Sequence, residues 1–171
     1  NGEIVHVGSA DPSNIWKADG KYYMQAGNKP VLKNFGTGEN AEERYKGDWT
    51  DLFRSDDLKT WEYVGRFYKN PKMGQDDYPD ETEDDMCPSF LPLFDAEENG
   101  KPTGKYLQLF ISHNHGCQYY IGSMDGERFV PESHGRMTWK DTAYFAPEAL
   151  VDDKNRQIIW SWLAPASSGM I

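Results

Sequence analysis

The sequence predicts an all-β fold and, within that class, a β-propeller. Short apolar and aromatic segments recur between turn-forming residues, and the 171 residues include six Trp, ten Tyr and eight Phe. No stretch has a convincing helical period. Three similar segments, each with a proline close to acidic residues, open three strand-rich regions at irregular intervals. Repetition of one strand unit favours a propeller over a sandwich or a barrel.

The three segments are built alike, and we call them the proline corners. The first contains Asp11-Pro12, the second Cys87-Pro88 and the third Ala146-Pro147. Each proline is followed within a few positions by a hydrophobic or aromatic residue, and then by a turn into a β-rich segment. We therefore expect one supersecondary unit used three times, with irregular insertions between the copies.

The first half of the chain is expected to form strands around two tight turns and one long loop. The Asp19-Gly20 pair supplies the positive φ that a tight hairpin needs. The polar, Gly-rich stretch 27–48 is expected to be a surface loop, and residues 55–61 a turn. The strands expected in this half are residues 4–7, 15–17, 22–26, 49–55 and 62–67.

The second half opens with the acidic stretch 69–85, whose simplest interpretation is a solvated loop. Later apolar segments are separated by polar turns that carry Asn-Gly or Asp-Gly pairs. The strands expected in this half are residues 90–94, 106–112, 118–122, 128–130, 149–151 and 157–163.

Composition limits the class of ligand. The formal net charge of −10 argues against nucleic acid, whose phosphates need a basic face, and against an anionic membrane. No apolar run reaches the roughly eighteen residues of a membrane span. A neutral ligand fits, and the aromatic content suits a sugar-binding face. Cys87 and Cys117 are expected to be two ordinary buried thiols. The start at Asn1 favours a mature or excised piece of a secreted or periplasmic protein.

Motifs at the corners resemble those of a known enzyme family. Ala10-Asp11-Pro12 resembles an Arg-Asp-Pro motif, Met86-Cys87-Pro88 a Glu-Cys-Pro motif, and residues 141–148 an Asp-Phe-Tyr-Ala-Pro-Gln stretch. With the strand–turn–strand segments 52–61 and 120–132, they follow the order found in glycoside hydrolase family 32, the invertase, inulinase and levanase group. The resemblance implies a five-bladed β-propeller. Residues 1–171 would be part of that single domain and cover roughly blades two to four.

The resemblance also implies an activity, the hydrolysis of β-fructosides such as sucrose, inulin or levan with retention of configuration. Retaining glycosidases use one carboxyl group as nucleophile and another as acid/base. The family's nucleophile lies in the first blade, so we expect it outside this chain. Asp11 matches the aspartate that stabilises the transition state; the alternative role for Asp11 is to cap a turn before proline.

The proton donor is open at this point, because Met86 stands where the family has glutamate and a thioether transfers no proton. Glu148 directly follows a corner and is the first candidate. Its alternative role is to pair with an arginine or a backbone amide. Asp85 adjoins Met86 and is the second candidate, although strand alternation would turn its side chain away.

Other side chains near the corners are candidates for substrate binding. Trp16, Tyr144 and Phe145 can stack on a furanose ring, and His113 and Asp141 can hydrogen-bond to sugar hydroxyls. His113 lies near His115, but no third ligand is spaced for a metal, so we expect no metal and no cofactor. The expected partners are an oligo- or polysaccharide and the remainder of the propeller from the same polypeptide.

Two other functions stay open. One is an arabinan- or xylan-directed hydrolase of a related five-bladed family that shares the Asp-Pro corner. The other is a non-catalytic carbohydrate-binding propeller, which Met86 motivates. Release of arabinose or xylose would select the first, and binding without turnover would select the second.

Overall fold

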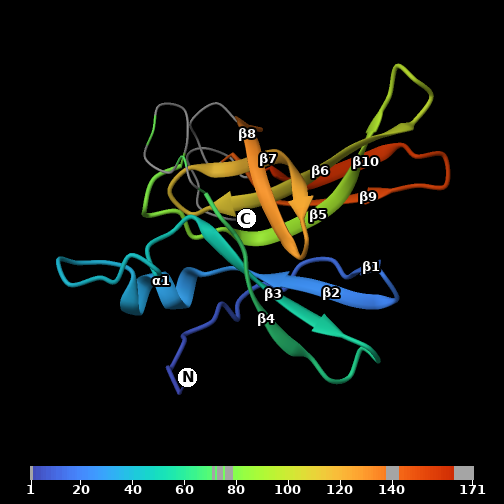
Figure 1. Cartoon of the computed structure of the whole chain (residues 1–171). Coiled ribbons are helices and arrows are strands. Elements are labelled where there is room, and N and C mark those ends of the chain that lie inside the picture. Colours follow the sequence, from blue (N-terminus) through green and yellow to red (C-terminus); the bar gives the residue numbers. More distant parts are fainter. Residues whose placement is uncertain (1, 71, 73–74, 76–78, 138–142, 164–171) are drawn as a thin grey trace.

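The computed structural model describes residues 2–70, 72, 75, 79–137 and 143–163. Within this part of the chain, ten strands form three antiparallel sheets (Figure 1). The first sheet contains β1 (Trp16–Ala18), β2 (Lys21–Ala26), β3 (Trp49–Ser55) and β4 (Glu62–Lys69). The second contains β5 (Met86–Asp95), β6 (Lys101–Ser112), β7 (Gly116–Asp125) and β8 (Arg128–Arg136). The third contains β9 (Tyr144–Val151) and β10 (Gln157–Leu163).

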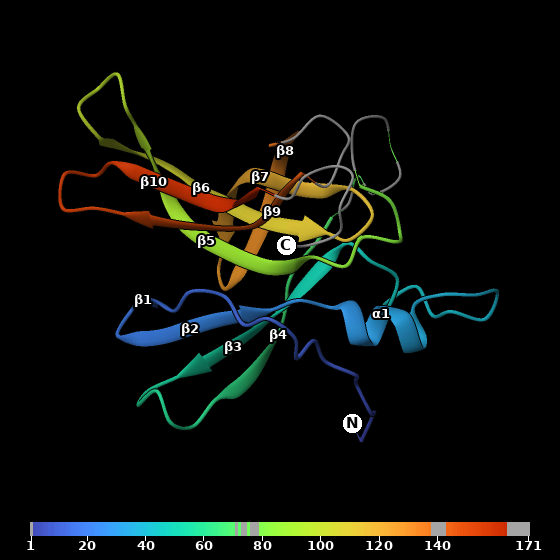
Figure 2. The same cartoon turned by 180° about the vertical axis from the view of Figure 1, so that it is seen from behind.

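Strands that follow one another in the sequence also lie side by side in each sheet. Four antiparallel strands in this simple order are the unit of a propeller blade. The first two sheets lie next to each other, and β9 and β10 run alongside β5 and β6 in both views (Figures 1 and 2). The described residues thus form two four-stranded blades and two strands of a third, and each of these three sheets begins at or just after a proline corner.

The predicted hairpin turn between β1 and β2 is confirmed. Asp19 and Gly20 have φ angles of 48° and 80°, and Ala18 pairs with Lys21. Two central residues with positive φ are the mark of a type I′ turn, whose twist matches that of the strands.

Aromatic side chains fill the space between the first two sheets. Phe67 of β4 meets Phe90 of β5 edge to face, with ring centroids 4.9 Å apart. Phe90 also stacks on Tyr106, and Phe129 of β8 contacts Phe67. Edge-to-face and offset-stacked pairs stabilise a core beyond their buried area. The other buried members of this cluster are Tyr23, Leu52, Tyr68, Phe110 and Tyr120.

A buried amide pair adds a polar link between the same two sheets. Gln25 of β2 donates to Gln108 of β6 at 2.7 Å, and Gln108 donates back at 3.1 Å. Thr50 Oγ1 donates to Gln25 as well. All three residues are fully buried. Because buried amides are costly unless paired, this reciprocal contact fixes the register of one blade against the next.

Two expectations about the first half are wrong. Residues 29–35, expected to be loop, form helix α1 (Lys29–Phe35), which buries Val31 and Leu32. Pro30 fits because amides of a first helical turn have no intrahelical partner. Residues 4–7, expected to be a strand, have none: Ile4 and Val5 are exposed and no neighbouring strand pairs with them. Alternation without a partner strand does not make a sheet.

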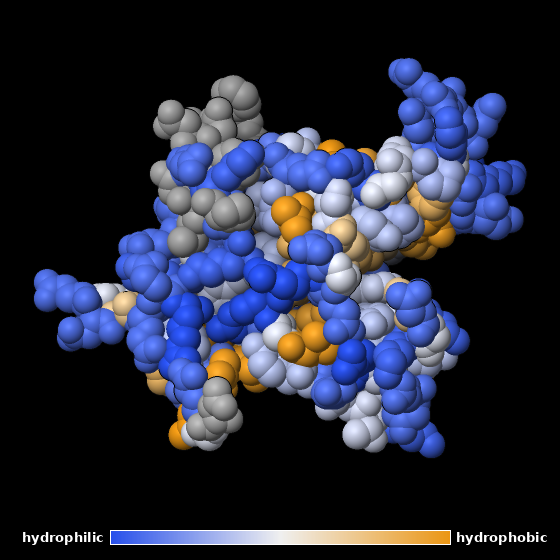
Figure 3. Space-filling model, in the orientation of Figure 1, coloured by the Kyte–Doolittle hydropathy of each residue, from blue (hydrophilic) through white to orange (hydrophobic). Residues whose placement is uncertain are grey.

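The third sheet leaves one face open. Trp160 and Trp162 of β10 are 48% and 65% exposed, and Ile158 is also exposed. On the view of Figure 3, by contrast, hydrophilic residues dominate and apolar residues gather only in small separate patches. In the described part of the chain, no helix is long and apolar enough to cross a membrane.

Candidate active site

The three proline corners share one unusual backbone conformation. The residue before each proline is left-handed, with φ of 45° at Asp11, 47° at Cys87 and 48° at Ala146. Left-handed conformations are costly for residues with a side chain, and proline normally keeps its preceding residue extended. The near-identical angles support the expectation of one unit used three times. Such strained residues concentrate at functional sites.

The corners converge on one small cluster. Met86, Ile111 and Cys117 are buried together, and Ala10, Cys87, Tyr144 and Phe145 pack against them. The cluster therefore collects one residue or more from each of the three corners. Segments far apart in the sequence meet here, which is what an active site assembled from several blades requires.

Asp11 is exposed at this meeting point. The thiol of Cys87 donates a hydrogen bond to its Oδ2, with an Sγ–Oδ2 distance of 3.4 Å. Burial and, after it, the nearby carboxylates of Asp11, Glu148 and Asp84 together raise the pKa of the Cys87 thiol to about 12. The thiol thus stays protonated and remains a donor to Asp11. Both cysteines are free, as expected from the sequence.

Side-chain bonds tie each corner to the next. The Asn14 amide donates to Phe90 O and accepts from Phe90 N, both at 2.8 Å, which joins the first corner to the second. Ser89 Oγ donates to Glu148 Oε1 at 2.9 Å, which joins the second to the third. The amide of Ala149 also donates to that oxygen. Glu148 is half-buried at the corners, so the structure brings it to the same place as Asp11.

A histidine and an aspartate form a second polar group at this site. Asp84 Oδ2 lies 2.7 Å from His113 Nδ1, and Asp84 Oδ1 accepts the His113 backbone amide. Lys29 Nζ lies 2.9 Å from the other ring nitrogen, Nε2. The ring edge of His113 meets Phe145, with centroids 5.7 Å apart. Asp84 and Lys29 were not recognised from the sequence, because one stood in the acidic run and the other in the supposed loop.

Asp85 lies elsewhere, beneath the corners. It is fully buried and accepts a hydrogen bond from Tyr68 at 2.9 Å. Its carboxyl group faces that of Asp48, which Asn70 and Tyr120 also contact. Burial, then the charge of Asp48, raise the pKa of Asp85 well above its ordinary value. This position offers no contact to a sugar, so the structure does not support Asp85 as the proton donor.

The acidic stretch is thus partly different from the expected solvated loop. Glu83, Asp84 and Asp85 at its end are all buried. Glu83 accepts from Gln118 at 3.0 Å and lies 3.3 Å from His115. In the described residues, no three His, Cys, Asp or Glu side chains gather as metal ligands would.

The remaining predicted binding residues fall in three places. Tyr144 and Phe145 lie in the corner cluster. Trp16 lies in the aromatic core instead: its ring stacks on Tyr23 and contacts Phe90 at 5.0 Å. Trp16 is thus half-buried against the interblade core and is not a member of the corner cluster. Asp141 lies outside the described residues.

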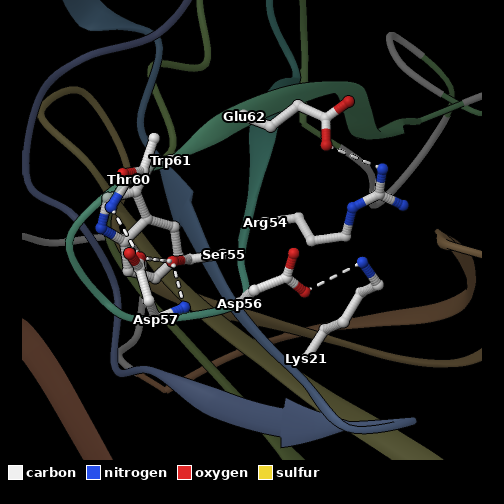
Figure 4. A pocket seen from close by; sticks show the side chains of 8 residues that line it. All are labelled: Lys21, Arg54, Ser55, Asp56, Asp57, Thr60, Trp61 and Glu62. Carbon is white, nitrogen blue, oxygen red and sulfur yellow. Dashed lines mark hydrogen bonds and ion pairs between the residues drawn. The ribbon is translucent and has the colours of Figure 1, made fainter.

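A pocket of about 280 Å³ lies at the turn that joins β3 to β4, and Figure 4 shows the side chains that line it. Lys21 pairs with Asp56 at 3.0 Å and Arg54 with Glu62 at 2.9 Å. Asp57 accepts backbone amides of the turn. The charged side chains that line it are thus engaged with each other or with the backbone. The pocket is a product of the β3–β4 turn and holds none of the corner residues.

The sequence model of the glycosyl hydrolases family 32 N-terminal domain matches residues 7–169. The chain belongs to glycosyl hydrolase family 32. The match covers all three corners, and the resemblance seen in the motifs is confirmed.

A relative of described activity agrees. The chain is 29% identical over 159 residues to sucrose-6-phosphate hydrolase of Bacillus subtilis. The aligned region covers 90% of this chain and 29% of the relative. The chain thus spans less than a third of the relative's length.

Solved structures show the same fold. The sucrose-6-phosphate hydrolase of Lactobacillus gasseri superposes with a TM-score of 0.59 at 20% identity, over 96% of this chain and 31% of its own. The family 32 β-fructofuranosidase of Bombyx mori gives 0.58 at 18% identity, over 90% and 29%. A family 43 arabinoxylan arabinofuranohydrolase of Bacillus subtilis gives 0.58 at 15% identity, over 93% and 34%. The predicted fold class, part of a five-bladed all-β propeller, is confirmed.

Proposed function

We propose that these residues are part of a glycoside hydrolase that cleaves β-fructosides with retention. The observation that carries the proposal is the exposed Asp11 carboxylate at a left-handed corner, held by the Cys87 thiol where three corners meet. Membership of family 32 supports it. Three corners that hold carboxylates together suit chemistry that passes through a positively charged sugar ring.

In this proposal, Asp11 stabilises the positive charge that develops on the fructosyl ring. Glu148 is the carboxylate that can face the sugar from the third corner, and Tyr144 and Phe145 supply its aromatic wall. The nucleophile is a carboxylate from the remainder of the propeller, supplied by the same polypeptide. Residues 1–171 would then be part of one propeller domain.

The test is incubation of the full-length protein with sucrose, sucrose 6-phosphate, inulin and levan. We expect release of fructose or fructo-oligosaccharides from at least one of them, with initial retention of configuration seen by NMR. Release of arabinose or xylose from plant polymers without fructose release would select the related hydrolases instead. An inactive protein would contradict the proposal.

Met86 supports a second candidate, a propeller that binds carbohydrate without cleaving it, because its buried thioether cannot act as an acid. Calorimetry that shows fructan binding by a protein with no turnover would select this function. We further propose a secreted or periplasmic location, as a polysaccharide substrate would require. Preference for sucrose 6-phosphate in the assay would count against that location.

A further inference from the structure

A sugar leaving group needs a proton, and the corners hold few groups that can give one. Met86 is 5% exposed and has no proton to transfer. Asp85 is fully buried against Asp48 and Tyr68. Glu148 has one carboxyl oxygen occupied by both Ser89 Oγ and the Ala149 amide.

His113 differs from Met86 in having a proton to transfer and from Asp85 in its exposure, while its Nε2 lies 2.9 Å from Lys29 Nζ. Its side chain is 41% exposed, while that of Asp84 is 9% exposed. Asp84 is held on both oxygens, by the backbone amide and by Nδ1 of His113. A buried carboxylate at Nδ1 fixes the ring orientation and leaves Nε2 as the nitrogen that exchanges protons. Across enzymes as a whole, histidine is the side chain that most often serves as general acid or base, whereas glycosidases ordinarily use carboxyl groups.

The ring also lies beside the rest of the site. Phe145 of the third corner contacts it, and Asp84 is close enough to Cys87 to raise the pKa of the thiol that binds Asp11. The charged groups that face the ring are Asp84 from the segment before β5 and Lys29 from α1; β9 contributes Phe145, which has no charge. The Lys29 ammonium donates to Nε2 when the His113 ring is neutral. Because an ammonium group cannot accept a hydrogen bond, Lys29 must move away from Nε2 when that nitrogen carries the proton.

We propose that His113, positioned by Asp84, is the general acid/base of this site; this rests on the proposed fructosidase function. His113 Nε2 gives its proton to the glycosidic oxygen as the bond to the anomeric carbon breaks, and the bonding electrons stay on that oxygen. A carboxylate nucleophile bonds to the carbon. In the second step water attacks the carbon, Nε2 takes a proton from it, and the carboxylate leaves with its electron pair.

The test compares two substrates in the full-length protein. Sucrose has a poor leaving group that needs a proton, whereas an aryl β-fructoside leaves as a phenolate and needs none. We expect His113→Gln to lower kcat/KM on sucrose by about 100- to 10,000-fold and on the aryl fructoside by less than about 10-fold. The alkaline limb of the sucrose pH profile should disappear.

Asp84→Asn keeps an acceptor for Nδ1 but loses the charge, so the alkaline limb should move to lower pH with a smaller loss of kcat. His115→Gln is the matched control. His115 lies two residues after His113 and likewise contacts a buried carboxylate, that of Glu83. It should leave both substrates unaffected. Melting temperatures of all variants establish that each is folded.

Three results would overturn the inference. Equal loss on both substrates in His113→Gln would mean a binding or structural role. A loss selective for sucrose in Glu148→Gln, with His113→Gln active, would make Glu148 the acid. A wild-type protein that cleaves no β-fructoside, whether sucrose, sucrose 6-phosphate, inulin, levan or the aryl fructoside, would remove the proposed function, and the inference with it. The first two results leave the proposed function intact.

Discussion

Asp11 combines an exposed carboxylate with a left-handed backbone. Asp11→Asn removes the charge but keeps the shape, and Asn tolerates positive φ as well as Asp does. If Asp11 stabilises a cationic transition state, kcat should fall at least about 100-fold, on the order of 3 kcal/mol, with an unchanged melting temperature. Turnover assays and thermal melts of the variant decide. Wild-type turnover would leave Asp11 only the role of capping a turn.

A second residue-scale prediction concerns the carboxyl pair of Asp48 and Asp85. One oxygen of each has no hydrogen-bond donor, and each residue is fully buried. A single shared proton between them accounts for both oxygens. Because the folded-state pKa of Asp85 is raised, its contribution to stability is fully present below the ordinary Asp pKa and is lost as pH rises through the folded value.

Asp85→Asn should therefore stabilise the protein toward neutral pH. An amide there can donate to Asp48 and still accept from Tyr68, so we expect a gain of about 1–3 kcal/mol. Denaturant unfolding at several pH values measures it, with the exposed Asp153→Asn as control. A flat difference across pH would show that the pair shares no proton. A stable variant that has lost turnover would instead support a catalytic role for Asp85.

The buried acids also show where residue-level prediction stops. The run that ends at Asp85 was interpreted as a solvated loop, which is what most acidic runs are. Asp85 is buried against Tyr68 of β4 and against Asp48, which in turn accepts from Asn70, the residue after β4, and from Tyr120 of β7. A local sequence pattern cannot predict partners that are so far apart in the sequence. The Asp-Pro of the first corner, in contrast, could be recognised from adjacent residues alone.

At the scale of elements, the β3–β4 turn offers a clean prediction. Ser55 is buried, and its Oγ accepts the amides of Asp57 and Leu58 at 3.2 and 2.9 Å. Ser55→Ala removes this acceptor and should cost about 1–2 kcal/mol. Asp56→Ala is the control, because its exposed ion pair with Lys21 contributes little. Equal melting temperatures for the two variants would contradict the role given to Ser55.

Strands were predicted better than the helix for a physical reason. The spans of β3 and β10 were predicted from their β-rich residues, and that of β9 was predicted in part. Helix α1 has only seven residues, a proline in its first turn and flanking glycines, so no full helical period can develop. Its stability comes from burying Val31 and Leu32 against the rest of the fold. That contribution is tertiary and absent from a local pattern.

At the scale of the molecule, Asn14 is a clamp between blades. Asn14→Ala would leave the buried amide and carbonyl of Phe90 without partners, and we expect a loss of roughly 2–4 kcal/mol. Asn14→Asp can accept from the amide but cannot donate to the carbonyl, so it should recover only part. Denaturant unfolding of the three proteins gives this order. An alanine variant as stable as wild type would show that the corners are held by packing alone.

The order of the corner motifs was enough to predict that three distant segments would meet. It could not predict which side chains would face the meeting point, because that depends on packing between blades. Asp84 lies just before β5 and His113 just after β6, so the two side chains meet only when β6 pairs with β5. The same packing places the ring of Trp16 against Phe90 and Tyr23 of the interblade core, a neighbourhood that the motif alone does not indicate.

The exposed face of β10 affects how residues 1–171 would behave if they were produced alone. Trp160 and Trp162 are exposed on a sheet of only two strands, next to an edge with unpaired backbone groups in the described structure. Such an edge is a template for other chains. We therefore expect residues 1–171, produced alone, to self-associate through this edge. Their yield in soluble form should therefore depend on whatever else in the polypeptide covers those two indole rings.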